Sequence, residues 1–379
     1  MVRRSIVGAA MLAAMLLAAA SAQASFPGKQ GRIAFQWDPN GMAAPEPEIA
    51  AINPDGSGFA TLTSNGAAQF DSLPAYSADG SRLLFGQFNS GSLDFQILIA
   101  NSDGSGQDGL LTSLGPSYDP AFAPDGSSFA YVCDTGAGTA ICARQTTGAA
   151  LAALADRLGD DLEPSYSRDG RLFFSNNNGG DKEIFVRSAS GVVTQLTSNT
   201  IDDEEPNPSP DGKLLAFVGG PSGGEIVVMH SDGTSPVTLT STAAAESNPS
   251  FSPDGKLIAF ERGGGLFAMP AAGGAATPLT NLPSDVSGAP DWQPIPVKCG
   301  GRRATQVGTP GRDVLVGTPG PDVLAGLGGR DALKGKKGND VLCGGAGKDA
   351  LSAGKGRKDR CIGGKGADTG RACEKAKSL

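Results

Sequence analysis

The stretch Glu205-Pro206-Asn207-Pro208-Ser209-Pro210-Asp211-Gly212 decides the fold, because variants of it recur along the middle of the chain. The other copies begin at Leu73, Asp119, Glu163 and Asn248, and their Asp-Gly pairs lie 46, 44, 42 and 43 residues apart. Asp-Gly suits the tight turns of β-hairpins, since Gly adopts positive φ freely and Asp tolerates it. A fixed period in the forties, built from short strand signals, is typical of β-propeller blades.

Each copy is followed by two short apolar stretches that read as strands, such as Leu214 to Val218 and Glu225 to Met229, separated by a Gly-rich gap. Every unit then closes on Leu-Thr or a related pair. Six closures predict six blades of about four strands each; they lie at Leu62-Thr63, Leu111-Thr112, Leu154-Ala155, Leu196-Thr197, Leu239-Thr240 and Leu279-Thr280.

The two ends of the repeat are complementary. The first unit starts at Gly31 to Phe35 and lacks the Pro-x-aromatic strand that opens the others, whereas Ala289 to Trp292 supplies such a strand with no unit after it. We therefore expect the last strand to complete the first blade, which leaves no open sheet edge. The Ala/Leu-rich segment from Gly148 to Leu158 favours a helix by propensity, but its register in the repeat predicts a strand or loop.

From Gly308 the spacing shortens to nine residues, in the pattern Gly-x-x-Gly-x-Asp-x-Leu-x. A turn of six residues and a strand of three would make half a coil of a parallel β-roll, with the leucines from Leu315 to Leu351 facing inward. The aspartate at position six offers a hard anionic oxygen of the kind that Ca²⁺ prefers. The candidate metal ligands are Asp313, Asp322, Asp331, Asp340, Asp349, Asp359 and Asp368.

The forty-residue units resemble the TolB-type, WD40-like propeller repeat, and the nine-residue units resemble the calcium-binding repeats of the repeats-in-toxin (hemolysin-type) family. The resemblance implies an all-β protein, a six-bladed propeller followed by a small parallel β-roll, with Ca²⁺ as cofactor. In the family each ion lies between turns of units two apart, which implies up to five sites. Basic residues stand beside several ligand positions, at Arg312, Arg330 and Lys348, so the alternative is a weakly binding roll held by disulfides.

Residues 1–24 have the pattern of a secretory leader, with Arg3 and Arg4, an apolar run and Ala22-Gln23-Ala24 as a cleavage pattern. A retained anchor is the alternative. The expected domains are therefore the leader, a propeller over residues 25–296 and a roll over residues 297–379. We expect a secreted protein, with a periplasmic or wall-associated location as the alternative, and no transmembrane segment after cleavage.

The six cysteines fit disulfides in an oxidising compartment. If Ala137-Gly138 forms the turn, Cys133 and Cys142 lie directly opposite each other on a hairpin and can bridge. The other four, Cys299, Cys343, Cys361 and Cys373, allow three connectivities.

Acidic residues just before the innermost strands would meet around one mouth of the propeller channel. We expect this acidic funnel to take a cation, a basic peptide or a polyhydroxylated ligand, and the alternative is a solvated rim. The candidate ligand-binding residues are Asp71, Asp119, Glu163, Glu205 and Glu246.

His230 is the only histidine among the 379 residues, which argues against most zinc sites and His-dependent nucleophiles. The segment after residue 296 has 17 Lys/Arg and 8 Asp/Glu, although the whole chain has a net charge of −8. We expect a monomeric, non-enzymatic scaffold whose partner is a protein or a cell-envelope polymer rather than a nucleic acid. A polysaccharide lyase or hydrolase built on a carboxylate pair is the alternative.

Overall fold

The computed structural model describes residues 25–38, 47–64, 66, 68–113, 117–178, 180–221, 224–279, 288–308 and 311–378. Contacts divide the chain into two compact units, one containing Gly31–Gln293 and the other containing Pro294–Leu379. The expected leader lies outside the described residues.

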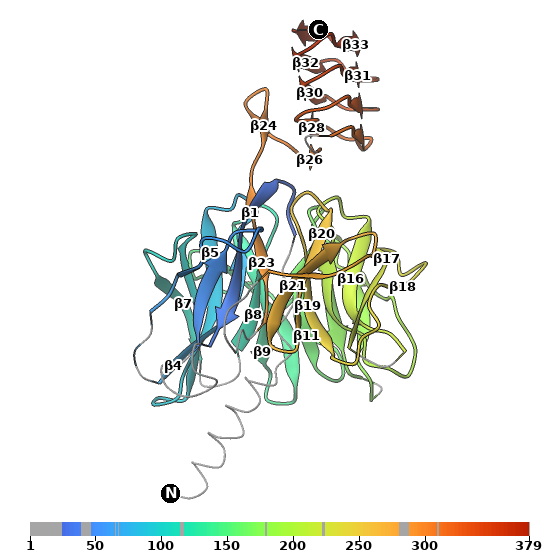
Figure 1. Ribbon diagram of the computed structural model, residues 1–379. Coiled ribbons are helices and arrows are strands. Elements are labelled where there is room, and N and C mark those ends of the chain that lie inside the picture. Colours follow the sequence, from blue (N-terminus) through green and yellow to red (C-terminus); the bar gives the residue numbers. More distant parts are fainter. Residues whose placement is uncertain are drawn as a thin grey trace, which may run out of the picture. The chain divides into compact units, whose positions relative to one another are not determined.

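The described part of the first unit forms six antiparallel sheets arranged as blades around an axis (Figure 1). This confirms the six-bladed propeller. Five blades have four strands: β23(Asp291–Ile295), β1(Lys29–Trp37), β2(Glu48–Ile52) and β3(Ala60–Thr61); β4(Gln69–Tyr76), β5(Arg82–Asn89), β6(Asp94–Asn101) and β7(Asp108–Ser113); β11(Asp161–Tyr166), β12(Leu172–Asn176), β13(Glu183–Arg187) and β14(Val193–Gln195); β15(Glu204–Pro208), β16(Leu214–Gly219), β17(Glu225–His230) and β18(Val237–Thr238); β19(Glu246–Phe251), β20(Leu257–Arg262), β21(Gly265–Pro270) and β22(Thr277–Pro278).

The third blade is a sheet of three strands, β8(Ser117–Phe122), β9(Ser128–Asp134) and β10(Thr139–Gln145). Its Ala/Leu-rich outer segment is not helical, and it joins β10 through single bridges from Ala150 to Arg144 and from Ala155 to Ile141. The prediction of a strand or loop is confirmed, because pairing with β10 outweighs a weak helical propensity.

The ring closes as the ends of the repeat predict. Strand β23 pairs with β1, although more than 250 residues of sequence separate them. Trp292 is buried against Ile33 and Phe35 of β1, and its indole Nε1 donates a hydrogen bond to Ser250 O of β19 at 3.1 Å. One side chain therefore ties the first blade to the sixth.

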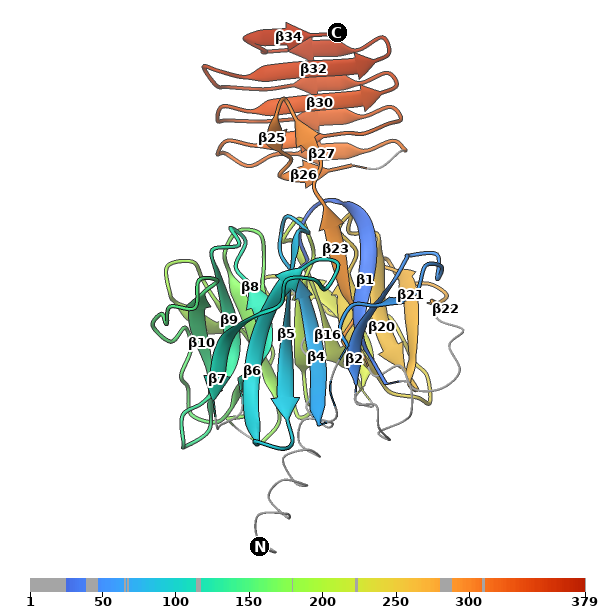
Figure 2. The same cartoon turned by 90° about the vertical axis from the view of Figure 1, so that its left-hand side faces the viewer.

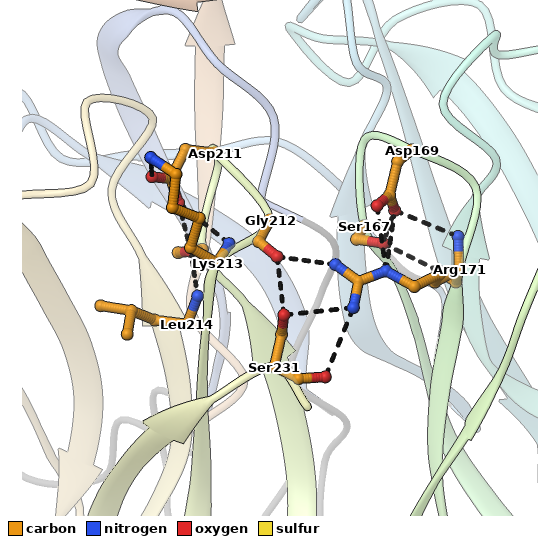
Figure 3. A network of polar contacts seen from close by, with 9 residues as sticks. Ser167, Asp169, Arg171, Asp211, Gly212, Lys213, Leu214 and Ser231 are labelled. Carbon is orange, nitrogen blue, oxygen red and sulfur yellow. Dashed lines mark hydrogen bonds and ion pairs between the residues drawn. The ribbon is translucent and has the colours of Figure 1, made fainter. Parts of the chain in front are cut away.

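Neighbouring blades are also joined through their Asp-Gly turns. Arg171 follows one such turn, and its Nη2 donates to Gly212 O in the Asp-Gly turn of the next blade at 2.6 Å, while Nη1 donates to Ser231 Oγ at 3.1 Å (Figure 3). Arg82 makes the same kind of bond to Gly126 O, also at 2.6 Å. The repeated phrase thus supplies both a hairpin turn and an acceptor for the preceding blade.

The second unit is a parallel β-roll, and its strands stack as Figure 2 shows. Two sheets alternate along the chain, so that strands in one sheet come from units two apart. One sheet contains β27(Val314–Val316), β29(Ala332–Lys334), β31(Ala350–Ser352) and β33(Thr369–Arg371); the other contains β26(Gln306–Val307), β28(Val323–Ala325), β30(Val341–Ala346), β32(Arg360–Lys365) and β34(Lys375–Lys377).

Leucines from both sheets meet inside the roll, as the nine-residue pattern predicts. Leu324, Leu333, Leu342 and Leu351 are fully buried or nearly so, and Leu315 packs against them. A short hairpin of β24(Lys298–Cys299) and β25(Arg302–Arg303) packs against β28 and β30.

All six cysteines are paired, as Cys133–Cys142, Cys299–Cys343 and Cys361–Cys373. The first pair forms as expected, but the two residues are not directly opposite. Cys133 faces Ala140 and Cys142 faces Tyr131, because the turn comes earlier than expected, between Asp134 and Thr139. The diagonal pair still has a Cα–Cα separation of 5.9 Å, which a disulfide spans.

A candidate calcium site in the roll and an acidic ring in the propeller

The seven aspartates at position six of the roll units lie in two stacks, one beside each sheet. In the first stack the backbone N–H groups of Asp313, Asp331 and Asp349 each donate to Oδ1 of the aspartate one coil further on, at 2.8 Å. In the second stack Asp322 N donates to Asp340 Oδ1 and Asp340 N donates to Asp359 Oδ1, again at 2.8 Å. The nine-residue spacing therefore brings the predicted metal residues into two regular columns.

An eighth acidic residue completes the second stack. Asp359 N donates to Glu374 Oε2 at 2.7 Å, and Glu374 precedes β34 as Asp359 precedes β32. The nine-residue pattern does not reveal Glu374, because it lies 15 residues after Asp359 and interrupts the spacing. The feature that could have identified Glu374 is its position directly before a three-residue strand. We call these seven aspartates and Glu374 the carboxylate ladder.

The second oxygen of most ladder aspartates is buried without a hydrogen-bond partner among the described residues. A buried anionic oxygen is costly when nothing compensates it. This holds for the Oδ2 atoms of Asp331, Asp340, Asp349, Asp359 and Asp368.

Glycines and carbonyl groups surround these oxygens. A Cβ atom added at Gly335 would lie 2.5 Å from Ala353 O and closer still to Asp340 Oδ2, and one added at Gly326 would lie 2.5 Å from Gly344 O. Glycine is therefore required at position one, where a backbone carbonyl of the next coil and a carboxylate oxygen converge. The two atoms nearest to such a Cβ are oxygens in both cases, one from a carboxylate and one from a carbonyl group, and we call the space at each such glycine a cradle.

This donor set fits calcium, which binds carboxylate and backbone carbonyl oxygens. No group of three His, Cys, Asp or Glu side chains that could hold a metal occurs in the described ranges, so an ion here would depend on carbonyl oxygens as well as carboxylates. Burial raises the pKa of Asp331 to about 6, and repulsion from Asp349 and Asp313 adds to this increase. Burial also raises the pKa of Asp340 and of Asp349, and repulsion from neighbouring ladder aspartates adds to both increases. A bound cation would remove this repulsion.

The basic residues at position five point away from this interior. Arg312, Arg330 and Lys348 are exposed, while Asp331 and Asp349 next to them are buried. No ion pair within 4.0 Å connects these three cations to a carboxylate of the described chain. They do not occupy the cradles, so the residues present leave room for a metal ion.

The five candidate acids of the propeller lie inside the innermost strands rather than just before them. Their exposed fractions are all 2% or less. They occupy two ring positions two residues apart: Asp71 and Glu246 at the first, and Asp119, Glu163 and Glu205 at the second.

At the second ring position the backbone forms a β-bulge with positive φ, at 54° for Asp119, 58° for Glu163 and 56° for Glu205. A proline follows each, and the conformation is strained for a residue with a side chain. Glu163 Oε2 accepts a hydrogen bond from Glu205 N at 2.8 Å, and Glu205 Oε2 accepts one from Asn248 N. Glu163 and Glu205 each fasten their own bulge to that of the next blade.

Charge partners accompany this ring. Lys182 Nζ lies 3.2 Å from Glu163 Oε1 and also pairs with Glu204. Burial lowers the pKa of Lys182, but attraction to Glu163 and Glu204 outweighs it and raises the pKa above its ordinary value. Burial, followed by repulsion from Glu163, raises the pKa of Glu205 well above its usual range.

The acids of the first ring position are equally well bonded. Glu246 forms an ion pair with Arg262 Nε at 2.8 Å and accepts a hydrogen bond from Thr240 Oγ1 at 2.8 Å. Gln87 Nε2 donates to Asp71 Oδ1 at 2.8 Å. The bonds to Gln87 and Arg262 join neighbouring strands of one blade, and the bond from Thr240 links the fifth blade to the sixth. Ligand binding by the ring stays a prediction.

Known protein families match both the propeller and the roll. The family model described as the TolB beta propeller domain matches residues 29–295, and the model of the RTX calcium-binding nonapeptide repeat matches residues 307–342 and 326–357. A protein TolB homolog of Chlorobium chlorochromatii is 30% identical over 140 residues, which cover 37% of this chain and 31% of that protein. The uncharacterized peptidase YuxL of Bacillus subtilis is 32% identical over 152 residues, which cover 38% and 21%.

Solved structures show the same fold. TolB from Acinetobacter baumannii superposes with a TM-score of 0.62 at 25% identity, over 71% of this chain and 68% of that one. Hydrazine synthase of Kuenenia stuttgartiensis reaches a TM-score of 0.57 at 16% identity, over 71% and 47%, which is a likeness of fold alone. The matched segments span about a third or less of the curated relatives' own length. This chain belongs to the TolB beta propeller domain family, and RTX calcium-binding nonapeptide repeats follow its propeller.

Proposed function

We propose that this protein is a secreted, non-enzymatic binding protein in which the propeller is an interaction platform and the roll binds Ca²⁺. The observation that carries the calcium role is the carboxylate ladder. Five of its Oδ2 atoms are buried, and four of these, in Asp331, Asp340, Asp349 and Asp368, lie beside glycines at position one. Asp313, Asp322, Asp331, Asp340, Asp349, Asp359 and Asp368 would supply the carboxylates, and carbonyl groups such as Ala353 O would supply the remaining oxygens.

The cysteines support the exported location. The six cysteines form three disulfides, which suits an exported protein. The structure has, within the residues it describes, no helix with the length and apolar character to span a membrane. His230, the only histidine of the sequence, is exposed at the end of β17, with Nδ1 3.0 Å from Thr234 Oγ1.

For the propeller we propose a protein or cell-envelope polymer as the partner, by analogy with TolB-like propellers as platforms. Asp71, Asp119, Glu163, Glu205 and Glu246 are proposed to shape the mouth of its channel, where their carboxylates order the backbone. We further propose that the domains are the leader, the propeller over residues 25–296 and the roll over residues 297–379.

Calorimetric titration of the full chain with Ca²⁺, disulfides intact, tests the calcium role. We expect binding heat at or below about 1 mM, within the range of extracellular calcium modules. Gly335→Ala should lose part of this heat, because its methyl group enters the cradle of Asp340. Gly320→Ala is the matched control, since the nearest atom to its added Cβ is Thr318 Oγ1 at 3.6 Å. No heat in the wild-type chain at millimolar calcium would overturn the proposal.

A further inference from the structure

In the segment after residue 296, most acidic side chains are buried and nearly all basic side chains are exposed. All eight of its acidic residues belong to the carboxylate ladder, and six of them are buried. Of its 17 Lys and Arg residues, 16 are exposed and Arg303 is half-buried. The charged side chains exposed on its surface are therefore cations, with Glu374 as the exception.

Three of these cations form a regular column. Val314, Ala332 and Ala350 pair with one another on successive strands of one sheet. Two residues before each of them stands a cation, in the order Arg312, Arg330 and Lys348. Neighbouring strands in a sheet are about 4.8 Å apart, so the column presents one cation per coil at that interval. The column follows from the 18-residue repeat itself, since each cation is position five of every second unit.

The column borders a groove. Arg312, Arg330 and Lys348 line it together with the small side chains of Ala332, Ala350 and Thr369. Two ladder carboxylates, Asp331 and Asp349, also line it, and their Oδ1 atoms are engaged by backbone N–H groups. Small side chains beside a row of cations leave space in which an extended anion can lie against the positive charges.

We propose that this groove binds a linear acidic polysaccharide, with Arg312, Arg330 and Lys348 contacting successive anionic groups along the chain. Guanidinium groups suit carboxylates and sulfates because their planar donors bind two oxygens at once. The segment contains no aromatic residue after Trp292, so it has no platform on which the bases of a single-stranded nucleic acid could stack. This proposal specifies a ligand for the proposed binding role, and it rests on that role in requiring a folded roll.

The test is binding of the full chain to immobilised heparin at about 0.15 M salt with 1 mM Ca²⁺, and neutral dextran as the blank. The triple variant Arg312→Gln/Arg330→Gln/Lys348→Gln should bind about tenfold or more weakly. The matched control, Arg302→Gln/Lys375→Gln/Lys377→Gln, removes three exposed cations from the other sheet and its hairpin. It should lose less than about threefold, because charges outside the groove act only through screened attraction.

Equal losses of heparin affinity in the two triple variants would refute binding in the groove. They would indicate general electrostatic attraction to the basic surface instead. Absence of wild-type binding to heparin, or equally tight binding of single-stranded DNA, would overturn the polysaccharide. Calcium heat is measured separately on the same variants, and its retention shows that the roll is folded. A wild-type chain that binds heparin through the groove but gives no calcium heat would refute the calcium role and leave the groove in place.

Discussion

Replacing Trp292 with alanine should open the propeller at its closure. The indole is 3% exposed, packs against β1, and donates to Ser250 O of the sixth blade at 3.1 Å. A buried Trp removes roughly 200 Å² from water, worth about 5 kcal/mol at 25 cal/mol per Å². The alanine methyl group keeps part of this burial energy, whereas the hydrogen bond to Ser250 is lost. We therefore expect the free energy of unfolding to fall by about 4 kcal/mol.

Trp292→Phe is the control, because it keeps an aromatic ring but loses the Nε1–H donor. We expect it to cost about 1 to 2 kcal/mol. Both variants retain Trp37, which packs against the same cluster and becomes the only tryptophan. The fluorescence of Trp37 therefore follows unfolding of this blade without a signal from the roll, which has no aromatic residue.

The measurement is urea unfolding by this fluorescence, with hydrogen exchange of the β1 and β16 segments alongside. The alanine variant should unfold about 1 M earlier than the phenylalanine variant. Its β1 amides, including Gln36 N bonded to Gly288 O at 3.1 Å, should exchange faster while β16 changes little. Equal midpoints for the two variants, or equal changes in both segments, would refute the role of Trp292 in closure.

Three further predictions concern other contacts. Burial raises the pKa of Asp203 to about 6, so between pH 4 and pH 6.5 the wild-type propeller should lose about 1 to 2 kcal/mol more stability than Asp203→Asn, as measured by urea titrations at both pH values. Arg171→Ala should cost about 1 to 2 kcal/mol through its lost bonds to the next blade (Figure 3), whereas Lys213→Ala, whose ion-pair partner is also exposed, should cost below about 0.5 kcal/mol by thermal unfolding; a reversed order would contradict the role of the turn bonds. Replacing Cys299 and Cys343 with serine removes a cross-link over 44 residues, and should destabilise the roll by about 4 kcal/mol by the loop-entropy estimate, seen as loss of its β circular dichroism at lower urea than in the wild type.

The repeats made most of the fold predictable. Asp211-Gly212 and its equivalents mark turns because the local backbone needs positive φ there, and this requirement is visible in any single unit. The same holds for the leucines of the roll, whose period places them on one face. Even the closing strand could be expected, since a missing strand at Gly31 matched an extra one at Trp292.

Features that depend on contacts between units were harder to predict. Glu163 looks like any surface acid in sequence, but the bulge before Pro164 turns it toward the backbone of the next blade. Glu374 joins the ladder only because the last coil is shortened. The pairing of Cys299 with Cys343 depends on a hairpin that packs against the roll, and no local pattern announces that.

Closure of the ring by β23 has a consequence for how the chain folds as it is made. Strand β1 emerges first, yet its inner neighbour follows more than 250 residues later. Until β23 has left the ribosome, the edge of the first blade stays open to other chains. Synthesis of β23 therefore sets the earliest moment at which the propeller can become resistant to aggregation, and a chaperone that delays pairing of β1 would act before that moment.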